Sequence, residues 1–302
     1  MSSPVSSAGT EAAQAAFVRA MPAVFVLIWS TGFVVARLGM PHAPPLGFLA
    51  LRYALSVLAF GIWIAIARPR WPRDRGQWMH LAITGMLMHG GYLGGVWAAV
   101  KAGISAGTVA LIVGLQPVLT ALWVSYTGSE HRISGRQWIG LGLGLAGLLL
   151  VVWRKLGLGE VTAFNLALSL FALFSITAGT LYQKRFVKPC DVRTANTVQL
   201  MAAFVVTLPL ALLEHEPIRM HPELIGAMAW SVLALTLGGS SLLYLLIQRG
   251  AATQVASLLY LVPPCTALMA WLLFGEELGA TVIAGLALTA VGVWLVVRRP
   301  SR

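Results

Sequence analysis

Two stretches of this sequence decide its fold, and they read GISAGTVALIVGLQPVLTALW at residues 103–123 and GAATQVASLLYLVPPCTALMA at residues 250–270. An offset of 147 residues places Gly103 on Gly250 and Pro117 on Pro264. After two residues are removed from the first copy beyond Glu130, Gly140 and Arg154 fall on Gly285 and Arg299. Each copy predicts an apolar helix with a proline at mid-span, a short loop with Gly and Glu, and a second, Gly-rich apolar helix. An internal repeat of apolar segments with prolines at matching places is typical of secondary transporters.

The composition excludes a soluble globule. Only 10% of the 302 residues are charged, 58% are hydrophobic and the mean hydropathy is +0.81, whereas a soluble domain carries about 25% charged residues. The formal net charge is +11, but the basic residues form short runs between apolar spans, as the positive-inside rule predicts for membrane proteins. We therefore expect a lipid bilayer around the protein and no nucleic-acid partner.

Ten apolar segments are long enough to cross roughly 30 Å of hydrocarbon as helices. They lie at residues 21–39, 46–67, 78–100, 104–126, 133–153, 162–182, 195–213, 223–247, 252–274 and 279–297. Residues 1–20 are rich in Ser and Ala and predict a disordered N-terminal tail. Residues 21–155 are predicted to form a first repeat of five helices and residues 160–299 a second. The sequence thus predicts an all-α integral membrane protein with ten transmembrane helices.

The loop charges give the orientation. With the N-terminus in the cytoplasm, fifteen Lys and Arg residues lie in cytoplasmic segments and four in external ones, which predicts that both termini are cytoplasmic. Each repeat has five helices, so equivalent helices run in opposite directions. The loop with Arg132 and Arg136 would lie inside, whereas its counterpart with Glu276 and Glu277 has no basic residue and would lie outside. The repeat is therefore predicted to be inverted.

This arrangement resembles the drug/metabolite transporter superfamily, in its EamA-type branch, over residues 21–299. The residues that carry the resemblance are Trp29-Ser30, Leu51-Arg52-Tyr53, the unit Gly103…Pro117…Glu130 and the unit Gly250…Pro264…Glu277. The resemblance implies an export or exchange carrier for amino acids, related metabolites or drugs in a bacterial inner membrane. It also implies a central cavity enclosed by the first, third, fourth, sixth, eighth and ninth helices. The overall pattern is similar to the aromatic amino-acid exporters of this branch.

Pro117 and Pro264 are candidate hinges. A proline within a helix removes one hydrogen bond and clashes with the preceding turn, and in lipid the freed carbonyl must be satisfied by protein or water. A kink that lines the cavity and flexes during transport is one interpretation. A kink that only serves packing is the other. Their equivalent positions in the two repeats favour the hinge.

His89 lies near the middle of the third predicted helix. No predicted span core holds an Asp or Glu, so His89 is the one mid-membrane side chain expected to titrate near neutrality. It is predicted either to carry a proton or contact a substrate carboxylate, or to hold the bundle together as a neutral imidazole. Tyr92 shares its face of the helix.

Further candidates for the cavity are polar and aromatic residues on the predicted cavity helices. They are Trp29, Ser30, Phe33, Gln116, Phe174, Tyr182, Tyr244 and Tyr260. Arg37 is a candidate for the cavity mouth, and Arg52 is expected to reach the outer headgroups with its long side chain. An apolar, aromatic pocket of this kind suits a ligand with a large apolar body and one small polar end.

We expect a secondary transporter that exports or exchanges small amphipathic metabolites, most of all aromatic or hydrophobic amino acids, by alternating access. A broad drug/metabolite carrier, a channel and an intramembrane enzyme are the alternatives. The enzyme is disfavoured because the sequence lacks a paired-Asp motif, a His-Glu-x-x-His motif and an acid in the core of any predicted span. The sequence also has no ATP-binding motif. No catalytic residue, metal site or cofactor is expected, and the carrier is predicted to be a monomer.

Overall fold

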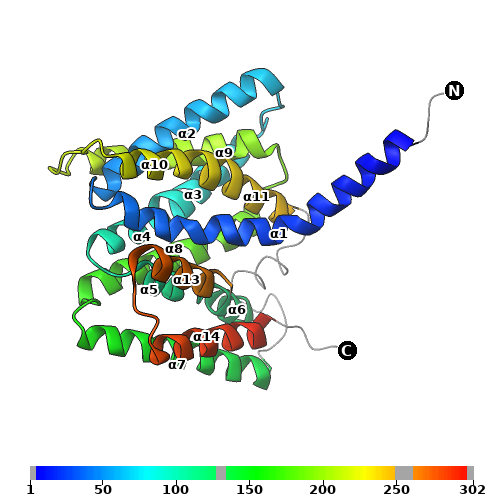
Figure 1. Ribbon diagram of the computed structural model, residues 1–302. Coiled ribbons are helices and arrows are strands. Elements are labelled where there is room, and N and C mark those ends of the chain that lie inside the picture. The colour runs from blue at the N-terminus through cyan, green and yellow to red at the C-terminus, as the bar shows by residue number, and fades with distance from the viewer. Residues whose placement is uncertain (1–4, 127–133, 249–260, 298–302) are drawn as a thin grey trace.

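The computed structural model describes residues 5–126, 134–248 and 261–297, and all their regular elements are helices, so the predicted all-α fold is confirmed (Figure 1). The elements are α1 (Val5–Gly39), α2 (Pro45–Ala67), α3 (Arg75–Gly85), the π-helix η1 (Met86–Gly91), α4 (Tyr92–Lys101), α5 (Ala106–Val113), α6 (Gln116–Tyr126), α7 (Gly135–Gly157), α8 (Ala163–Phe186), α9 (Val192–Ala211), α10 (Pro222–Trp230), the π-helix η2 (Ser231–Ser240), α11 (Ser241–Gln248), α13 (Val262–Phe274) and α14 (Ala280–Val297). Consecutive short elements account for single predicted spans: α3, η1 and α4 form the third, α5 and α6 the fourth, and α10, η2 and α11 the eighth.

Six of the described helical spans are long and apolar enough to cross a membrane, and three further apolar helices are shorter. One of these is α13, which covers the second part of the ninth predicted span. The first part of that span, with Tyr260, lies outside the described residues. Each described helix overlaps one of the ten predicted spans, as expected for a multi-pass membrane protein.

The N-terminal tail is not disordered throughout, because α1 begins at Val5 and continues into the first predicted span. Residues 8–16 read AGTEAAQAA, and Ala, Glu and Gln are among the strongest helix formers. The prediction of disorder weighed the Ser residues and overlooked this run. In Figure 1 the start of α1 projects beyond the helix bundle.

Pro117 and Pro264 each stand in the first turn of a described helix. In the fourth span α5 ends at Val113 and α6 begins at Gln116. Pro117 is therefore the second residue of α6, where its missing N–H removes no helical hydrogen bond. Pro263 stands in the first turn of α13 and Pro264 follows it. For Pro117 the prediction of a lost mid-helix hydrogen bond was wrong, since the chain interrupts the helix between Val113 and Gln116. Pro264 stands in the first turn of α13, and the residues before Leu261 lie outside the described part of the chain.

The break between α5 and α6 lies against the first turn of α13. A Cβ atom added to Gly114 would lie 2.6 Å from Cγ of Pro263, so no larger residue fits there without movement. Glycine at this position allows the break in the first half to touch the start of α13 in the second. The contact involves the residue three positions before Pro117 and the residue just before Pro264.

The glycines of α7 and α14 bring these two helices into close contact, as the small-residue stripes predict. A Cβ atom on Gly147 would lie 2.5 Å from the carbonyl oxygen of Gly285, and one on Gly292 would lie 2.5 Å from that of Gly140. In Figure 1 this pair forms one side of the bundle, away from α2 and α9. It serves as scaffold.

The two π-helices occupy matching places in the two halves. Shifted by the repeat offset of 147, η1 falls at about residues 233–238, inside η2 (Ser231–Ser240). A π-helix replaces the usual hydrogen bonds by i→i+5 bonds and is found most often at functional sites. Their matched positions direct attention to the space between them.

Candidate functional site

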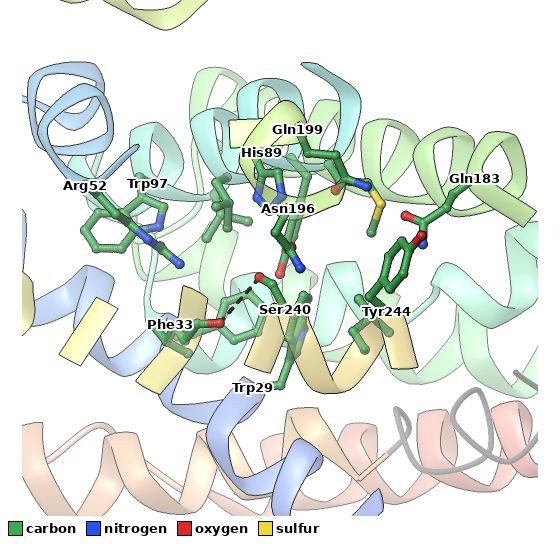
Figure 2. A pocket seen from close by; sticks show the side chains of 17 residues that line it. Trp29, Phe33, Arg52, His89, Trp97, Gln183, Asn196, Gln199, Ser240 and Tyr244 are labelled. Carbon is green, nitrogen blue, oxygen red and sulfur yellow. Dashed lines mark hydrogen bonds between the residues drawn. The ribbon is translucent and has the colours of Figure 1, made fainter. Parts of the chain in front are cut away.

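A cavity of about 670 Å³, counting its opening, lies between elements of both halves. Its aromatic and aliphatic lining consists of Trp29, Phe33, Met88, Tyr92, Leu93, Val96, Trp97, Leu235, Leu243 and Tyr244, and Gly32 also lines it. Its polar lining consists of Arg52, His89, Gln183, Asn196, Gln199 and Ser240. No lining residue in the described part of the chain is an Asp or Glu. The cavity thus combines aromatic walls with amides and one permanent cation (Figure 2).

The structure places five of the predicted site residues around this cavity, and they are Trp29, Phe33, His89, Tyr92 and Tyr244. They come from α1, η1, α4 and α11. The indole of Trp29 stacks on the ring of Tyr92, with the ring centroids 6.3 Å apart and the planes 5° apart. This pair forms a flat apolar wall, a surface suited to an aromatic or planar ligand.

Other predicted residues lie elsewhere. Phe174 is 59% exposed on the outer side of α8, because Leu173 and Ile176 occupy the buried side of the helix. Its assignment to the cavity was wrong for this reason. Ser30 is buried, but its hydroxyl donates to the carbonyl of Val26 one turn earlier in the same helix and does not line the cavity.

Gln116, Tyr182 and Arg37 do not line this cavity either. The amide of Gln116 donates to Oγ1 of Thr180 at 3.0 Å. The hydroxyl of Tyr182 lies 2.8 Å from Nδ1 of His80, and the neighbouring residue of α8, Gln183, lines the cavity in its place.

The half-buried Arg37 has its guanidinium 5.9 Å from the ring centroid of Phe274 in α13. The side chain therefore meets the second half of the chain. This contact does not bring it to the cavity.

The position of Arg52 differs most from what the sequence predicts. The expectation that it reaches the headgroups was wrong, because the side chain is only 4% exposed and lines the cavity. It follows Pro45, the first residue of α2, by seven residues, which is about 10 Å along the helix. Its Nε donates to Oγ1 of Thr236 in η2 at 3.1 Å, and its guanidinium lies 6.0 Å from the centroid of Trp97.

Among the described residues, no Asp or Glu forms an ion pair with Arg52. Leaving an ion buried without a partner costs about 3–5 kcal/mol. The sequence held one signal for this position: an arginine this far from the helix start stands too deep for easy access to the headgroups.

His89 is held by its backbone and its neighbours. The Tyr53 hydroxyl donates to the carbonyl of His89 at 2.7 Å, and the two rings meet edge to face at 6.2 Å. The His89 side chain is 8% exposed and lies at the cavity wall in Figure 2. The π-helix and the Tyr53 hydrogen bond together fix the position from which the imidazole faces the cavity.

Sequence reasoning missed the amides of the seventh span. Asn196 and Gln199 lie three residues apart in α9 and line the same cavity. The Nδ2 atom of Asn196 donates to the carbonyl of Val192 at 2.9 Å, whereas Nε2 of Gln199 is buried with no hydrogen-bond partner in the described part of the chain. Two amides on one face of an apolar helix were the available signal.

The set of helices around the cavity therefore differs from the implied one. The second and seventh spans contribute Arg52, Asn196 and Gln199, and no described residue of the fourth or ninth span lines the cavity. The fourth and ninth spans instead meet where Gly114 packs against Pro263.

Polar contacts join the two halves at the end of the bundle that holds the α1–α2 loop. Both carboxylate oxygens of Glu214 accept from the first backbone N–H groups of α2, at Leu46 and Gly47. The Lys101 ammonium pairs with Glu216 at 2.6 Å. A third contact joins the segment between α13 and α14 to the start of α5: the carboxylate of Glu276 accepts from the N–H of Ala106, the first residue of α5. These contacts hold together segments that are far apart in the sequence.

Glu160, in the loop between α7 and α8, belongs to a local network. Its carboxylate accepts from the Lys155 ammonium at 2.8 Å and from the N–H of Ser105 at 2.9 Å. Burial alone would raise the pKa of this carboxyl, but the hydrogen bonds from Lys155 and Ser105 and the charge of Lys155 hold the pKa below its usual range.

One group of metal-ligand side chains occurs in the described part of the chain, formed by His42, His221 and Glu223. Nε2 of His42 lies 2.8 Å from Oε2 of Glu223, and the two imidazoles stack at 4.2 Å with their planes 11° apart. Each imidazole lone pair lies in its own ring plane, so two nearly parallel rings cannot both direct a nitrogen to one ion about 2 Å away. The group reads as a polar contact between the α1–α2 loop and α10.

The sequence profile of the EamA-like transporter family matches this chain twice, at residues 20–153 and 164–298. The chain belongs to the EamA-like transporter family. It is thus a multi-pass membrane transporter and not an enzyme. Each match covers one of the two segments that the sequence repeat separates.

Curated relatives are similar over most of their length. Proteins named "Probable amino-acid metabolite efflux pump" from Salmonella typhimurium and Escherichia coli K12 are 26% and 24% identical over 280 residues, which is 89% of this chain and 91% of each relative. The inner membrane transporter YedA of Escherichia coli K12, which is named as uncharacterized, is 25% identical and covers 88% of this chain. One solved crystal structure aligns with a TM-score of 0.65 at 18% identity, over 91% of this chain and 95% of its own. That likeness concerns the fold alone.

Proposed function

We propose that this transporter exports small amphipathic metabolites, above all amino acids with aromatic or hydrophobic side chains. It works as a monomer in a bacterial inner membrane with both termini in the cytoplasm. Relatives named as amino-acid metabolite efflux pumps and as an inner membrane transporter support this proposal. The basic residues of the loops support the orientation.

The observation that carries the proposal is the cavity between the two halves. Its aromatic walls, with Trp29 stacked on Tyr92, offer a surface for an apolar side chain. Its amides and Arg52 offer hydrogen bonds for a small polar end. This combination of apolar surface and few polar groups is typical of sites for small organic ligands.

Transport proceeds by alternating access. The two halves rock about the contact between Gly114 and Pro263, where the helical hydrogen-bond ladder of the fourth span is already interrupted. In one state the polar contacts of Glu214 and Lys101 close one end of the cavity. In the other state they separate, so that the ligand leaves on that side. No cofactor takes part, and the gradient of the transported molecule or of an exchanged one drives the cycle.

Counterflow in proteoliposomes tests the proposal. Vesicles with reconstituted protein are loaded with unlabelled phenylalanine, leucine, glutamate or lysine, and the uptake of labelled phenylalanine is measured with and without a pH gradient. We expect phenylalanine and leucine to accelerate uptake, with Trp29→Ala reducing the effect. Equal acceleration by a hydrophobic cation such as tetraphenylphosphonium would favour a broad drug carrier, and acceleration by none of these would contradict the proposal.

The orientation is tested separately. Cysteines are introduced as Pro72→Cys and Ile218→Cys and exposed in intact cells to a membrane-impermeant maleimide. Position 218 should react and position 72 should react only with a permeant reagent. Reaction of both from the same side would contradict the inverted topology.

A further inference from the structure

The buried guanidinium of Arg52 has donors that the protein does not use. An arginine side chain carries five N–H donors in a planar fork. Among the described residues, the one hydrogen bond of this side chain runs from Nε to Oγ1 of Thr236. The terminal nitrogens therefore have no protein acceptor there. Figure 2 shows the guanidinium pointing from α2 into the cavity.

The charge of this guanidinium is not balanced by the cavity walls. No Asp or Glu is among the described residues that line the cavity, and none forms an ion pair with Arg52. The imidazole of His89, the tyrosines and the amides are the other polar groups that face it from the surrounding elements. An uncompensated cation away from water attracts an anion, and a carboxylate matches the two parallel N–H groups of the fork.

A second unused donor lies in the same cavity. Gln199 is only 3% exposed, and its Nε2 is buried with no hydrogen-bond partner among the described residues. In Figure 2 the labelled side chains of Arg52, His89 and Gln199 surround the space that Trp29 faces from the other side. A charged donor and an orphaned amide donor thus belong to one cavity whose described lining includes no acidic acceptor. This favours an acceptor-rich ligand.

We propose that Arg52 anchors a carboxylate subsite, so that the molecules bound in this cavity carry a carboxylate at one end and an apolar body at the other. The apolar body lies against the stacked rings of Trp29 and Tyr92. This inference rests on the proposed function, but it commits to the charge of the ligand. Amines and amides without a carboxylate are excluded.

A purely structural role for Arg52 makes a different prediction. In that case the guanidinium only holds α2 against η2 and Trp97, through the contacts at 3.1 Å and 6.0 Å. Replacing it would then change the stability of the protein by the same amount with and without any ligand. A carboxylate subsite predicts that the replacement acts on the binding of acids and leaves that of neutral and cationic analogues unchanged.

The test uses probes that share one phenyl body and differ at the polar end. They are phenylalanine, 3-phenylpropionate, 3-phenylpropanamide and phenethylamine, and binding is measured as the shift in unfolding temperature of the purified full chain in detergent. We expect the two carboxylates to raise the unfolding temperature and the amide and amine to leave it unchanged. Arg52→Gln should weaken the binding of both carboxylates by about ten- to a hundred-fold, as expected for the loss of a charged hydrogen bond.

Two further variants serve as controls. Arg52→Lys keeps the charge without the fork and should retain part of the preference for acids. Arg185→Gln removes an exposed arginine that lies over the ring of Phe186, away from the cavity, and should bind all probes as the wild type does. Unchanged carboxylate binding by Arg52→Gln would overturn the proposal.

The wild-type protein decides the matter even if Arg52→Gln does not fold. Stabilisation by the amide equal to that by the carboxylate, or no stabilisation by any acid in a panel that adds benzoate, leucine and 4-methylpentanoate, would overturn the carboxylate subsite. Binding of acids without counterflow would instead contradict the proposed function and leave the subsite standing. Counterflow without a preference for acids would contradict the carboxylate subsite and leave transport by this protein standing.

Discussion

The two π-helices have the same place in the repeat but bring different chemistry to the cavity. With the offset of 147 residues, His89 of η1 corresponds to Thr236 of η2. His89 offers an imidazole to the cavity, whereas Thr236 accepts a hydrogen bond from Arg52 and donates one to the carbonyl of Ser231. Both halves have a π-helix at this position, but the side chains that it carries differ. An internally symmetric fold can therefore build an asymmetric cavity, with its permanent charge supplied by the first half.

The packing of the two π-helices also differs, and this gives the largest expected effect. A Cβ atom on Gly85, just before η1, would lie 2.1 Å from the carbonyl oxygen of Gln199, whereas one on Gly238 in η2 would lie 3.6 Å from its nearest neighbour. Gly85→Ala should destabilise the protein by about 3 kcal/mol or more, and Gly238→Ala should be tolerated. The folded fraction is measured by size-exclusion chromatography and by thermal unfolding.

Gly90→Ala is the matched control for this comparison, because apart from the adjacent backbone of its own helix no described atom lies within 4 Å of the added Cβ, although the residue belongs to η1. It should fold like the wild type. Similar losses in all three variants would mean that π-helical geometry itself, and not the contact with α9, forbids a side chain.

Trp29 lies between the two π-helices and should give the next largest effect. It stacks on Tyr92 and also approaches Gly239, whose added Cβ would lie 3.9 Å from the indole. Trp29→Ala removes apolar surface worth about 1–3 kcal/mol of ligand binding, so the affinity for phenylalanine should fall by about ten- to a hundred-fold. The equivalent change of a tryptophan outside the cavity, Trp153→Ala, should leave the affinity unchanged. Equal effects would remove Trp29 from the site.

Substitutions of His89 and Thr236, which occupy corresponding positions in the two π-helices, should have effects of intermediate size. Thr236→Val removes the hydrogen bond to Arg52 and should weaken binding of carboxylates by about ten-fold, in line with about 1.5 kcal/mol for a hydrogen bond to a charged group. His89→Gln keeps a polar group at the wall and should lower transport modestly. The pH profile of counterflow should not change with His89→Gln, because no acid in the described cavity holds a proton beside it. A pH-driven uptake abolished by this substitution would show proton coupling instead.

The smallest expected effect concerns the loop that connects the halves. The pKa of Glu160 lies below its usual range in the folded protein because of Lys155 and Ser105. Its contribution to stability is therefore present above pH 4.5, the ordinary value, and is lost as the pH falls through the lowered pKa. Glu160→Gln should reduce the unfolding temperature at pH 7 and diminish its decrease between pH 5 and 3. An identical pH dependence in both proteins would contradict this role.

Much of the fold could be predicted from the sequence, because the lengths of the apolar segments, the charges of the loops and the repeated Gly and Pro positions can be read without knowing how the helices pack. The spans, the close contact of α7 with α14 through Gly147 and Gly285, and the aromatic residues Trp29 and Tyr92 at the cavity followed from these signals. The helical segment that begins at Val5 was overlooked although its residues favour helix.

The polar lining was less predictable. Whether Arg52 faces headgroups or a cavity depends on how α2 packs against η2, and hydropathy does not specify which neighbours surround a span. The π-helices add residues to a turn without any change in composition, so η1 and η2 leave no periodic signal. The amides of α9 were missed because the resemblance implied other helices around the cavity.

The central claim is that this cavity holds the transported molecule and opens in turn to the two sides of the membrane. Ser240→Cys places a thiol in the cavity wall once Cys190 and Cys265 have been replaced by Ser. Its reaction with an impermeant thiosulfonate is followed in right-side-out and in inside-out vesicles, with and without phenylalanine. We expect the thiol to react from both sides of the membrane, and to react more slowly when phenylalanine is present. Reaction from one side alone, at a rate that phenylalanine does not change, would contradict the central claim.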